Sequence, residues 1–108
     1  MKFYIEIIIY NDLANFIAVY NLSKTDIVVN ANSTELYSKS ITVNASYTLI
    51  GFCPYCTDHF TICSVRYWDN ILSEDGTTRT ITFHFTLYNR YNNDREISDS
   101  GVTLIFSL

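Results

Sequence analysis

The clearest pattern in the chain is a strict alternation of apolar and polar residues between Thr77 and Tyr91. A period of two over that length is typical of a β-strand with one buried face and one wetter face. We therefore predict a long strand here with an aromatic and aliphatic core face. The predicted core face carries Ile81, Phe83, Phe85 and Leu87, and the other face carries Thr80, Thr82, His84, Thr86 and Tyr88.

A turn signal stands just before this strand. Asp75-Gly76 separates it from an aromatic and β-branched run that extends from His59 to Leu72. An Asp-Gly pair between two such runs predicts a β-hairpin, because glycine readily adopts the positive φ that the turn requires. The centre of the fold is therefore predicted to be an antiparallel hairpin around Leu72 to Tyr91.

Shorter strand-like segments precede and follow the hairpin. No window keeps the apolar spacing of three and four residues that a helix requires, and Asn11 to Tyr20, which comes nearest, has the β-branched and aromatic content of a strand. With turn signals at regular spacing, the pattern predicts an all-β antiparallel sandwich of about seven to nine strands in one domain, residues 1–108. The further strands are expected at Lys2–Tyr10, Phe16–Leu22, Asp26–Asn30, around Leu36, Ile41 and Val43, at Tyr47–Phe52, and at Glu96–Leu108, with Ser100-Gly101 introducing the last.

Composition and charge exclude several classes of function. The chain has 108 residues, 48% of them apolar, which is enough to build a single core without a metal. Its formal net charge is −4 and it has no basic run, whereas strong binding to a phosphate backbone requires clustered lysine and arginine. We therefore expect no nucleic-acid partner.

The location of the protein stays open at this point. Met1 to Tyr10 is apolar, but it contains Glu6 and lacks the small-residue cleavage site of a signal peptide. No apolar run approaches the roughly 20 residues that span a bilayer. We expect a soluble chain, and a secreted or surface-associated protein is compatible with this composition.

The most chemical motif is Cys53-Pro54-Tyr55-Cys56, which matches the active-site pattern of glutaredoxins. In that family the motif opens a helix that lowers the pKa of the first thiol, whereas here a strand pattern follows and no second proline exists. We predict a structural turn. Because Cys53, Cys56 and Cys63 are an odd number, one disulfide with a free thiol and three reduced thiols both stay open.

A zinc site is the alternative use of these cysteines. Cys53, Cys56, His59 and Cys63 fall within eleven residues, but structural zinc usually takes two well-separated pairs of ligands. His84 is expected on the polar face of the hairpin, opposite Val65 or Arg66 and far from His59. We therefore predict no metal and no cofactor.

Catalytic signatures are missing from the sequence. Neither a Gly-x-Ser-x-Gly motif nor a phosphate-binding glycine loop occurs, and the acidic pairs lie in predicted turns. A serine, a histidine and a carboxylate can be selected from almost any chain, so their presence alone indicates nothing. We predict that the protein is not an enzyme.

Aromatic residues give the best indication of function. Tyrosine occurs nine times, and amphipathic rings at loop tips suit flat ligands, sugars or a membrane interface. We predict a binding module that recognises a membrane lipid headgroup or a glycan, although the same rings would also serve to close the ends of a sandwich. The predicted ligand-binding residues are Tyr55, Tyr67, Trp68, Tyr88 and Tyr91.

The alternative is a structural protein that assembles with copies of itself, as a filament, coat or capsid-type subunit. A threonine ladder on the hairpin, together with Ile8 and Ile105 on faces that should be wet, would allow association through strand edges or through a flat sheet face. The partner would then be a homo-oligomer of the chain. The ladder consists of Thr78, Thr80, Thr82 and Thr86.

One family resemblance bears on this choice. The isoleucine-rich stretch from Phe3 to Leu22, the Cys53-Pro54-Tyr55 turn, and the ending Asp99-Ser100-Gly101-Val102 before an apolar strand are similar to segments of the aegerolysins. The family's early tryptophan and its cysteine-glycine-arginine signature do not occur in this chain. The resemblance implies a small acidic β-sandwich that binds membrane lipids, and it assigns no functional residue.

Overall fold

A computed structural model describes residues 17–108, and within this range the chain forms six β-strands and no helix. The all-β prediction is confirmed, but the described part contains six strands where seven to nine were predicted for the chain. The strand predicted at Lys2–Tyr10 lies outside the described residues. The strands are β1 (Ile17–Val29), β2 (Thr34–Asn44), β3 (Thr48–Cys56), β4 (Thr61–Leu72), β5 (Thr78–Asn89) and β6 (Arg95–Ser107).

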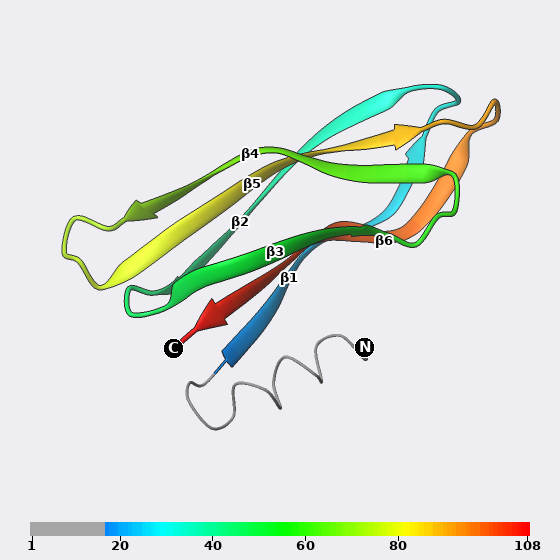
Figure 1. Ribbon diagram of the computed structural model, residues 1–108. Coiled ribbons are helices and arrows are strands. Elements are labelled where there is room, and N and C mark those ends of the chain that lie inside the picture. Colours follow the sequence, from blue (N-terminus) through cyan, green and yellow to red (C-terminus); the bar gives the residue numbers. More distant parts are fainter. Residues whose placement is uncertain (1–16) are drawn as a thin grey trace.

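The strands form two three-stranded antiparallel sheets (Figure 1). The first sheet has the order β1-β6-β3 and the second has the order β2-β5-β4. Only the connection from β4 to β5 stays within one sheet, and every other connection passes from one sheet to the other. Consequently β5 and β6 are central strands, whereas β1, β2, β3 and β4 are edges.

The predicted hairpin is present as β4 and β5. Gly76 has a φ of 75°, as the turn requires, and the Asp75 carboxylate accepts hydrogen bonds from the Ser73 and Thr77 hydroxyls at 2.7 and 2.8 Å. The register differs from the simple one, because a bulge between Val65 and Tyr67 adds one residue to β4. His84 therefore lies opposite Tyr67 and not opposite Val65 or Arg66.

Several predicted short strands are parts of longer ones. Residues 17–22 of the predicted strand Phe16–Leu22 and residues 26–29 of the predicted strand Asp26–Asn30 belong to the single strand β1, because Asp26 is accommodated as an unpaired residue with a φ of 53°. Phe16 lies outside the described residues. Aspartate adopts this left-handed conformation more readily than most residues. The region around Leu36, Ile41 and Val43 is likewise one continuous strand, β2.

The core combines the inner faces of both sheets. All four predicted core residues of β5 have an exposed fraction of 0%. Burying side chains of this size contributes about 1.5–3 kcal/mol each relative to leaving them exposed, so this cluster dominates the stability of the fold. The main cluster consists of Leu22, Val102, Leu104 and Phe106 from the first sheet and Val43, Ile81, Phe83 and Phe85 from the second.

The last strand is longer and more buried than predicted. Ser100-Gly101 does not introduce it but lies in its interior, since β6 begins at Arg95. Ile105, which was expected on a wet face, is only 6% exposed, and Thr103 on the same face is 2% exposed. The central strand β6 is therefore buried on both faces from Ser100 to Phe106.

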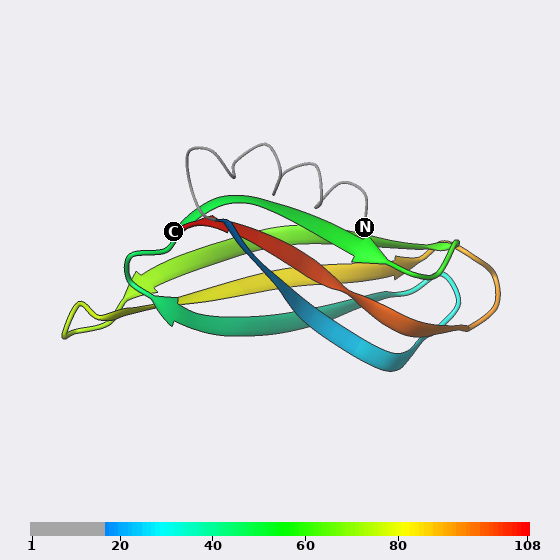
Figure 2. The same ribbon diagram turned by 90° about the horizontal axis from the view of Figure 1, so that it is seen from below.

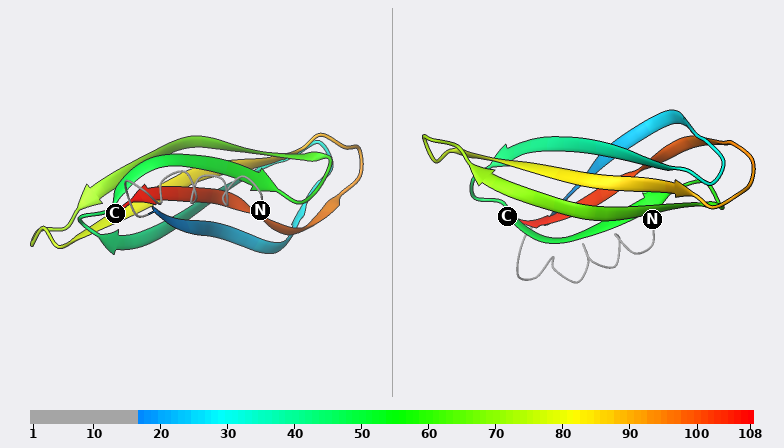
Figure 3. Two further views of the ribbon diagram at one scale, coloured as in Figure 1. Left: turned by 60° about the horizontal axis from the view of Figure 1, so that its bottom comes forward. Right: turned by 90° about the horizontal axis from the view of Figure 1, so that it is seen from above.

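Loops gather at the two ends of the strands (Figures 2 and 3). The β1–β2, β3–β4 and β5–β6 loops lie at one end, and the tip of the β4–β5 hairpin lies at the other. Asn89 links the first group: its Nδ2 donates to the backbone oxygens of Val29 and Asn93 at 3.0 and 2.9 Å, and its Oδ1 accepts from the Tyr91 amide at 2.9 Å. The stretch Asn89–Asp94 has the polar composition of an exposed loop, but Asn89 is fully buried.

Across residues 17–108, no helix is present that is long and apolar enough to cross a membrane.

Candidate binding face

The five aromatic residues predicted to bind a ligand do not come together in the structure. Tyr55, Tyr67, Trp68 and Tyr88 lie in strands, and only Tyr91 lies in a loop. Tyr67 and Tyr88 share the outer face of the β2-β5-β4 sheet, whereas Trp68 points toward the core side. A continuous aromatic rim at one loop end is thus not formed by these side chains.

Tyr55 is held by hydrogen bonds on the other sheet. Its hydroxyl lies 2.7 Å from Ser23 Oγ and donates to Asp99 Oδ1 at 3.2 Å. Burial is the main cause that raises the pKa of the Tyr55 phenol above its ordinary value. The hydroxyl therefore ties β3 to β1 and β6, and only part of the ring is available to a ligand.

Tyr91 is engaged in packing at the loop end. Its ring stacks on Phe60, with centroids 4.2 Å apart, and the Arg95 guanidinium lies 5.6 Å from the Tyr91 centroid and 5.0 Å from the Phe60 centroid. This arrangement joins the β3–β4 and β5–β6 loops. Tyr91 fits the alternative expectation, that some aromatic residues close the end of the fold.

The outer face of the β2-β5-β4 sheet, which we call the hydroxyl face, carries rows of hydroxyl groups. Strict alternation in β2 and β5 directs serine and threonine outward, opposite the core residues. Ser40 pairs with Thr82 at 2.8 Å and Thr42 pairs with Thr80 at 3.1 Å between hydroxyl oxygens. The hydroxyl face comprises Leu36, Ser38, Ser40 and Thr42 of β2, Thr80, Thr82, His84, Thr86 and Tyr88 of β5, and Ile62, Ser64, Tyr67, Asp69 and Ile71 of β4.

One row of this face contains three different functional groups. The Tyr67 ring stacks on the His84 imidazole with centroids 4.1 Å apart and an interplanar angle of 19°. On the other side of His84, its Nδ1 lies 2.7 Å from the Ser38 hydroxyl. The row therefore holds His84 in one orientation between two strands, while Tyr67 remains 57% exposed.

A shallow hollow of about 150 Å³ adjoins this row. Ser38, Arg66, Tyr67 and His84 contribute polar groups to its lining, and Leu36 adds an apolar wall. Arg66 and the next residue, Tyr67, both lie on the outer side because the β4 bulge inserts one residue between Val65 and Tyr67. A hydroxyl, an imidazole, a phenol and a guanidinium thus converge on a small concave area beside an exposed ring.

Apolar side chains flank the polar rows of the hydroxyl face. Leu36 and Ile71 are each 61% exposed, and Ile62 and Tyr88 are 44% and 40% exposed. Flat sheet surfaces that mix hydroxyl groups with exposed apolar area match ligands that are themselves amphipathic and flat. The face offers such a ligand both contact area and hydrogen bonds.

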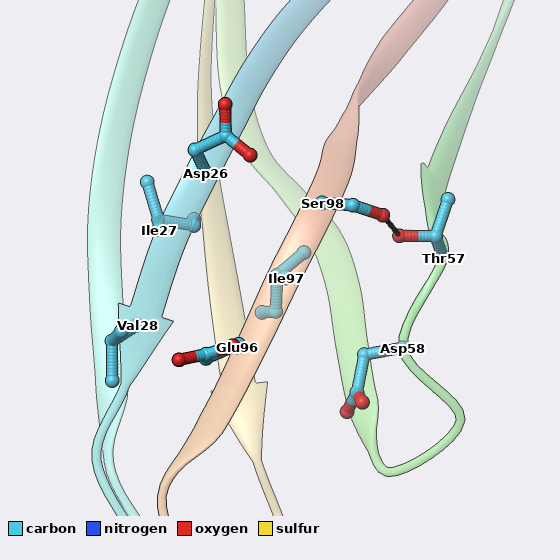
Figure 4. Close-up of a pocket in the computed structure, with 8 residues that line it drawn as sticks. All are labelled: Asp26, Ile27, Val28, Thr57, Asp58, Glu96, Ile97 and Ser98. Carbon is cyan, nitrogen blue, oxygen red and sulfur yellow. Dashed lines mark hydrogen bonds between the residues drawn. The ribbon is translucent and has the colours of Figure 1, made fainter.

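A larger hollow of about 460 Å³ lies over the β1–β6 end of the other sheet (Figure 4). Asp26, Asp58 and Glu96 surround it, and Thr57 Oγ1 and Ser98 Oγ lie 3.0 Å apart at one side. Asp26 and Glu96 are exposed, which is the usual state of surface carboxylates. We assign no ligand to this hollow.

Asp58 is committed to an ion pair. Its Oδ1 accepts hydrogen bonds from Arg95 Nε and Nη2 at 3.0 and 2.9 Å, and its side chain is 5% exposed. Burial by itself would raise the pKa of Asp58, but hydrogen bonds from Arg95, Thr61 and the Phe60 amide, with the charge of Arg95, bring the pKa below its ordinary value. Asp58 is therefore ionised and structural.

The three cysteines are free thiols in the structure. Pro54 lies opposite the core residue Val102, so alternation places Cys56 on the core side of β3 and Cys53 on the outer side. Cys63 packs with the core, and its Sγ lies 3.4 Å from the Gly101 oxygen. A disulfide from Cys53 to Cys56 or to Cys63 would therefore have to connect the outer side of β3 to the core side of the fold.

The raised pKa values of the Cys56 and Cys63 thiols also make these two groups unreactive. Burial raises the pKa of Cys56, and burial raises the pKa of Cys63 to about 11, whereas a redox-active cysteine needs a lowered thiol pKa. Among residues 17–108, no three histidine, cysteine, aspartate or glutamate side chains are grouped so that they could hold a metal ion. The structure thus does not assemble the zinc-ligand set considered from the sequence.

Sequence reasoning missed most of the hydroxyl face outside β5. Leu36, Ser38, Ser40 and Thr42 of β2 were not assigned a role, although they alternate with Tyr37, Lys39, Ile41 and Val43 in the sequence. That period of two was the available signal. The outward position of Tyr67, by contrast, depends on the bulge, for which the sequence holds no clear signal.

No known protein family, curated protein or solved structure matches this chain.

Proposed function

We propose that the two sheets pack as a β-sandwich that serves as a non-enzymatic carbohydrate-binding module, with the hydroxyl face as its binding surface. The observation that carries this proposal is the row formed by Ser38, His84 and Tyr67, in which an exposed aromatic ring adjoins fixed hydrogen-bonding groups. The predicted role of Tyr67 is retained. Tyr88 lies on the same face and would contact only an extended ligand.

The chemistry of a sugar ring fits this row. One face of a pyranose presents C–H groups that pack on an aromatic ring, and its edge presents hydroxyl groups that both donate and accept hydrogen bonds. Tyr67 supplies the platform, while the Ser38 hydroxyl and the Arg66 guanidinium line the adjacent hollow. The His84 imidazole stacks on one face of the Tyr67 ring and thereby fixes its position.

Two observations favour a glycan over the lipid headgroup that was the other predicted ligand. Tyr67 and Tyr88 lie within a flat sheet rather than at a loop tip, so they cannot insert between lipids without burying the polar rows around them. The chain also carries a net charge of −4, which disfavours anionic membrane surfaces. The aegerolysin resemblance points to lipids, so lipid vesicles are included among the ligands to be tested.

The direct test is binding of the full chain to a glycan array and to insoluble polysaccharides. Tyr67→Ala should weaken binding roughly five- to tenfold, because an aromatic contact of this kind is worth about 1–1.5 kcal/mol. Tyr67→Phe, which keeps the ring, should retain most of the affinity. Tyr91→Leu, at the loop end and away from the hydroxyl face, is the matched control and should bind normally while folded.

Vesicle pelleting separates the two ligand classes. Vesicles of phosphatidylcholine alone, and with sphingomyelin and sterol, should leave the protein in the supernatant. Pelleting that depends on Tyr67, together with no binding on the glycan array, would replace the carbohydrate proposal with the lipid one. Binding to glycans that is unaffected by Tyr67→Ala would move the site away from the hydroxyl face.

A further inference from the structure

Within residues 17–108, the two sheets leave strand edges unpaired on two sides, and these two sides differ in the residues that they carry. One side consists of β1 and β2, and the other consists of β3 and β4. An unpaired edge presents free backbone N–H and C=O groups that another strand can bind, and proteins discourage this with inward-pointing charges, prolines or bulges. The residues at each edge therefore indicate whether pairing is blocked or allowed.

The side formed by β1 and β2 carries inward-pointing lysines. Lys39 lies opposite the core residue Phe83, so it points to the inner face of the edge strand β2. Lys24 of β1 extends its Nζ to 5.4 Å from the ring of Tyr37 on the other sheet. An additional strand on this side would bury both ammonium groups, which is costly without a partner charge. This side is blocked.

The side formed by β3 and β4 leaves aromatic core residues uncovered. Phe52 and Trp68 both contact Phe83, with centroids 5.0 and 5.5 Å away, yet they are 40% and 42% exposed. Pro54 lacks an N–H group and so interrupts hydrogen bonding along β3. Edge strand β4 has no proline and no inward-pointing charge, and after its bulge at Arg66 the residues Tyr67 to Leu72 pair regularly with β5. This regular stretch is therefore the edge that remains available.

We propose that β4 pairs in an antiparallel manner with β4 of a second copy of this chain, about a twofold axis at Trp68. A twofold axis perpendicular to a sheet reverses the strand direction, so a strand paired with its own copy is antiparallel. With Trp68 opposite its counterpart, Tyr67 of one copy lies opposite Asp69 of the other. The two Trp68 side chains, with Phe52 beside each, then cover the exposed part of the core.

The charges of β4 identify a second copy as the occupant. Arg66 and Asp69 are the charged residues of this strand, and they have opposite signs. The β4 bulge places Arg66 on the same side as Tyr67, which brings it beside Asp69 of the second copy. The twofold axis forms this contact twice, so the edge is complementary to itself in charge.

The same pairing would join the hydroxyl faces of two copies. The joined sheet has six strands, and Tyr67 of each copy lies diagonally across the twofold axis from the other, about 7–8 Å apart for diagonal neighbours in a sheet. This extension rests on the proposed carbohydrate binding, whereas the dimer itself does not. Two adjacent platforms would bind a polysaccharide bivalently.

Sedimentation velocity of the full chain across concentrations tests the dimer. We expect a dimer at micromolar concentrations, and Arg66→Asp or Asp69→Arg alone should raise its dissociation constant at least tenfold by placing like charges together. The double variant R66D/D69R should restore the dimer, because the charges are only exchanged. Glu35→Arg on the blocked edge strand β2 is the matched control and should leave the dimer intact.

The outcomes separate cleanly. The proposal is overturned if the chain stays monomeric up to about 100 μM or forms a filament. It is also overturned if Glu35→Arg weakens the dimer while the charge reversals Arg66→Asp and Asp69→Arg do not. Failure of the double variant to recover also overturns it. Where a charge reversal prevents folding, judged by the strand signal in circular dichroism, the neutral variants Arg66→Gln and Asp69→Asn replace it and should weaken the dimer to a smaller extent. Glycan binding by a monomer would leave the proposed function standing without the dimer.

Discussion

Gly101 of β6 lies so close to the backbone carbonyl of Leu22 on β1 that a Cβ atom at position 101 would overlap with that oxygen. Its φ is 149°, a conformation that residues with a side chain rarely adopt. The obstacle is backbone of a neighbouring strand, which cannot move aside as a flexible side chain can. The missing side chain at position 101 therefore allows β6 to approach β1 closely at this point.

Gly101→Ala should therefore destabilise the protein by about 3 kcal/mol or more, through the overlap and the backbone conformation together. Urea unfolding followed by circular dichroism measures the change. Gly51→Ala is the control, because a Cβ at position 51 meets no atom within 4 Å, and its effect should stay within about 0.5 kcal/mol. Equal effects at the two positions would contradict the strand contact described here.

Asn89 gives a second prediction, at the loop end of the fold. Its amide donates to backbone oxygens of Val29 and Asn93, and its carbonyl accepts from the Tyr91 amide. Asn89→Asp keeps the shape but replaces the donors with a buried negative charge, and should cost about 2–4 kcal/mol. Asn92→Asp, an exposed residue of the same loop, is the matched control and should be nearly neutral.

If Asn89→Asp were as stable as the parent chain, the loop end would not depend on this amide. The sign of a pH effect adds a check. An aspartate buried at this position is destabilising when ionised, so the variant should regain stability as the pH falls toward the carboxyl range.

Some of this fold could be predicted because the local signals were simple. The alternation in β5 assigns every side chain to a face, and the structure buries all of Ile81, Phe83 and Phe85 completely. The positive φ of Gly76 follows from the same kind of reasoning, since a short turn between paired strands requires it.

What could not be predicted follows from single inserted residues. Without the bulge, a period of two would place Arg66 outward, Tyr67 inward and Trp68 outward. The inserted residue exchanges the faces of Tyr67 and Trp68, because a shift of one position reverses every side chain that follows. The candidate binding row and the uncovered core edge therefore both depend on a feature that residue identity does not signal.

Asp26 shows the same limitation in β1. Its polar side chain and neighbours suggest a break between two strands, whereas the structure passes through it as an unpaired residue with positive φ and keeps the same register, with Thr25 opposite Asp99 and Ile27 opposite Ile97. Whether a polar residue ends a strand or is accommodated within it is decided by the partner strand. That information is long-range and is not contained in the local pattern.

The cysteines give a third prediction, which distinguishes free thiols from a disulfide. In the native protein at pH 8, only the exposed Cys53 should react rapidly with a thiol reagent. Cys63 should react roughly tenfold more slowly than a thiol of ordinary acidity, because burial raises its pKa from 9.0 to about 11 and the smaller thiolate fraction outweighs the higher nucleophilicity of a more basic thiolate. Cys53→Ser should remove the rapid phase.

Unfolding in denaturant without a reductant should expose three titratable thiols. A count of one would indicate a disulfide, and three rapid thiols in the native protein would contradict the burial of Cys56 and Cys63. Counting before and after addition of a reductant makes the two cases distinct.

The ion pair between Asp58 and Arg95 gives the last prediction, which concerns pH. Asp58 has a pKa below its ordinary value of 3.8 in the folded protein, although burial acts in the opposite direction, because Arg95 and its other donors stabilise the carboxylate. A carboxyl group with a lowered folded pKa contributes stability above its unfolded pKa, and this contribution is lost as the pH falls through the folded pKa. The free energy of unfolding should therefore decrease below about pH 4.

Asp58→Asn should lower the free energy of unfolding by about 1–3 kcal/mol at pH 7, since it leaves Arg95 without its charged partner, and should reduce the loss of stability below about pH 4. Glu96→Gln removes an exposed carboxylate from the rim of the same hollow and should change neither quantity appreciably. Urea unfolding at a series of pH values from 2 to 7 measures both effects. An acid-induced loss of the same size in the Asp58→Asn variant and the parent chain would show that other carboxyl groups cause it, and the Asp58–Arg95 pair would then have no part in the pH dependence.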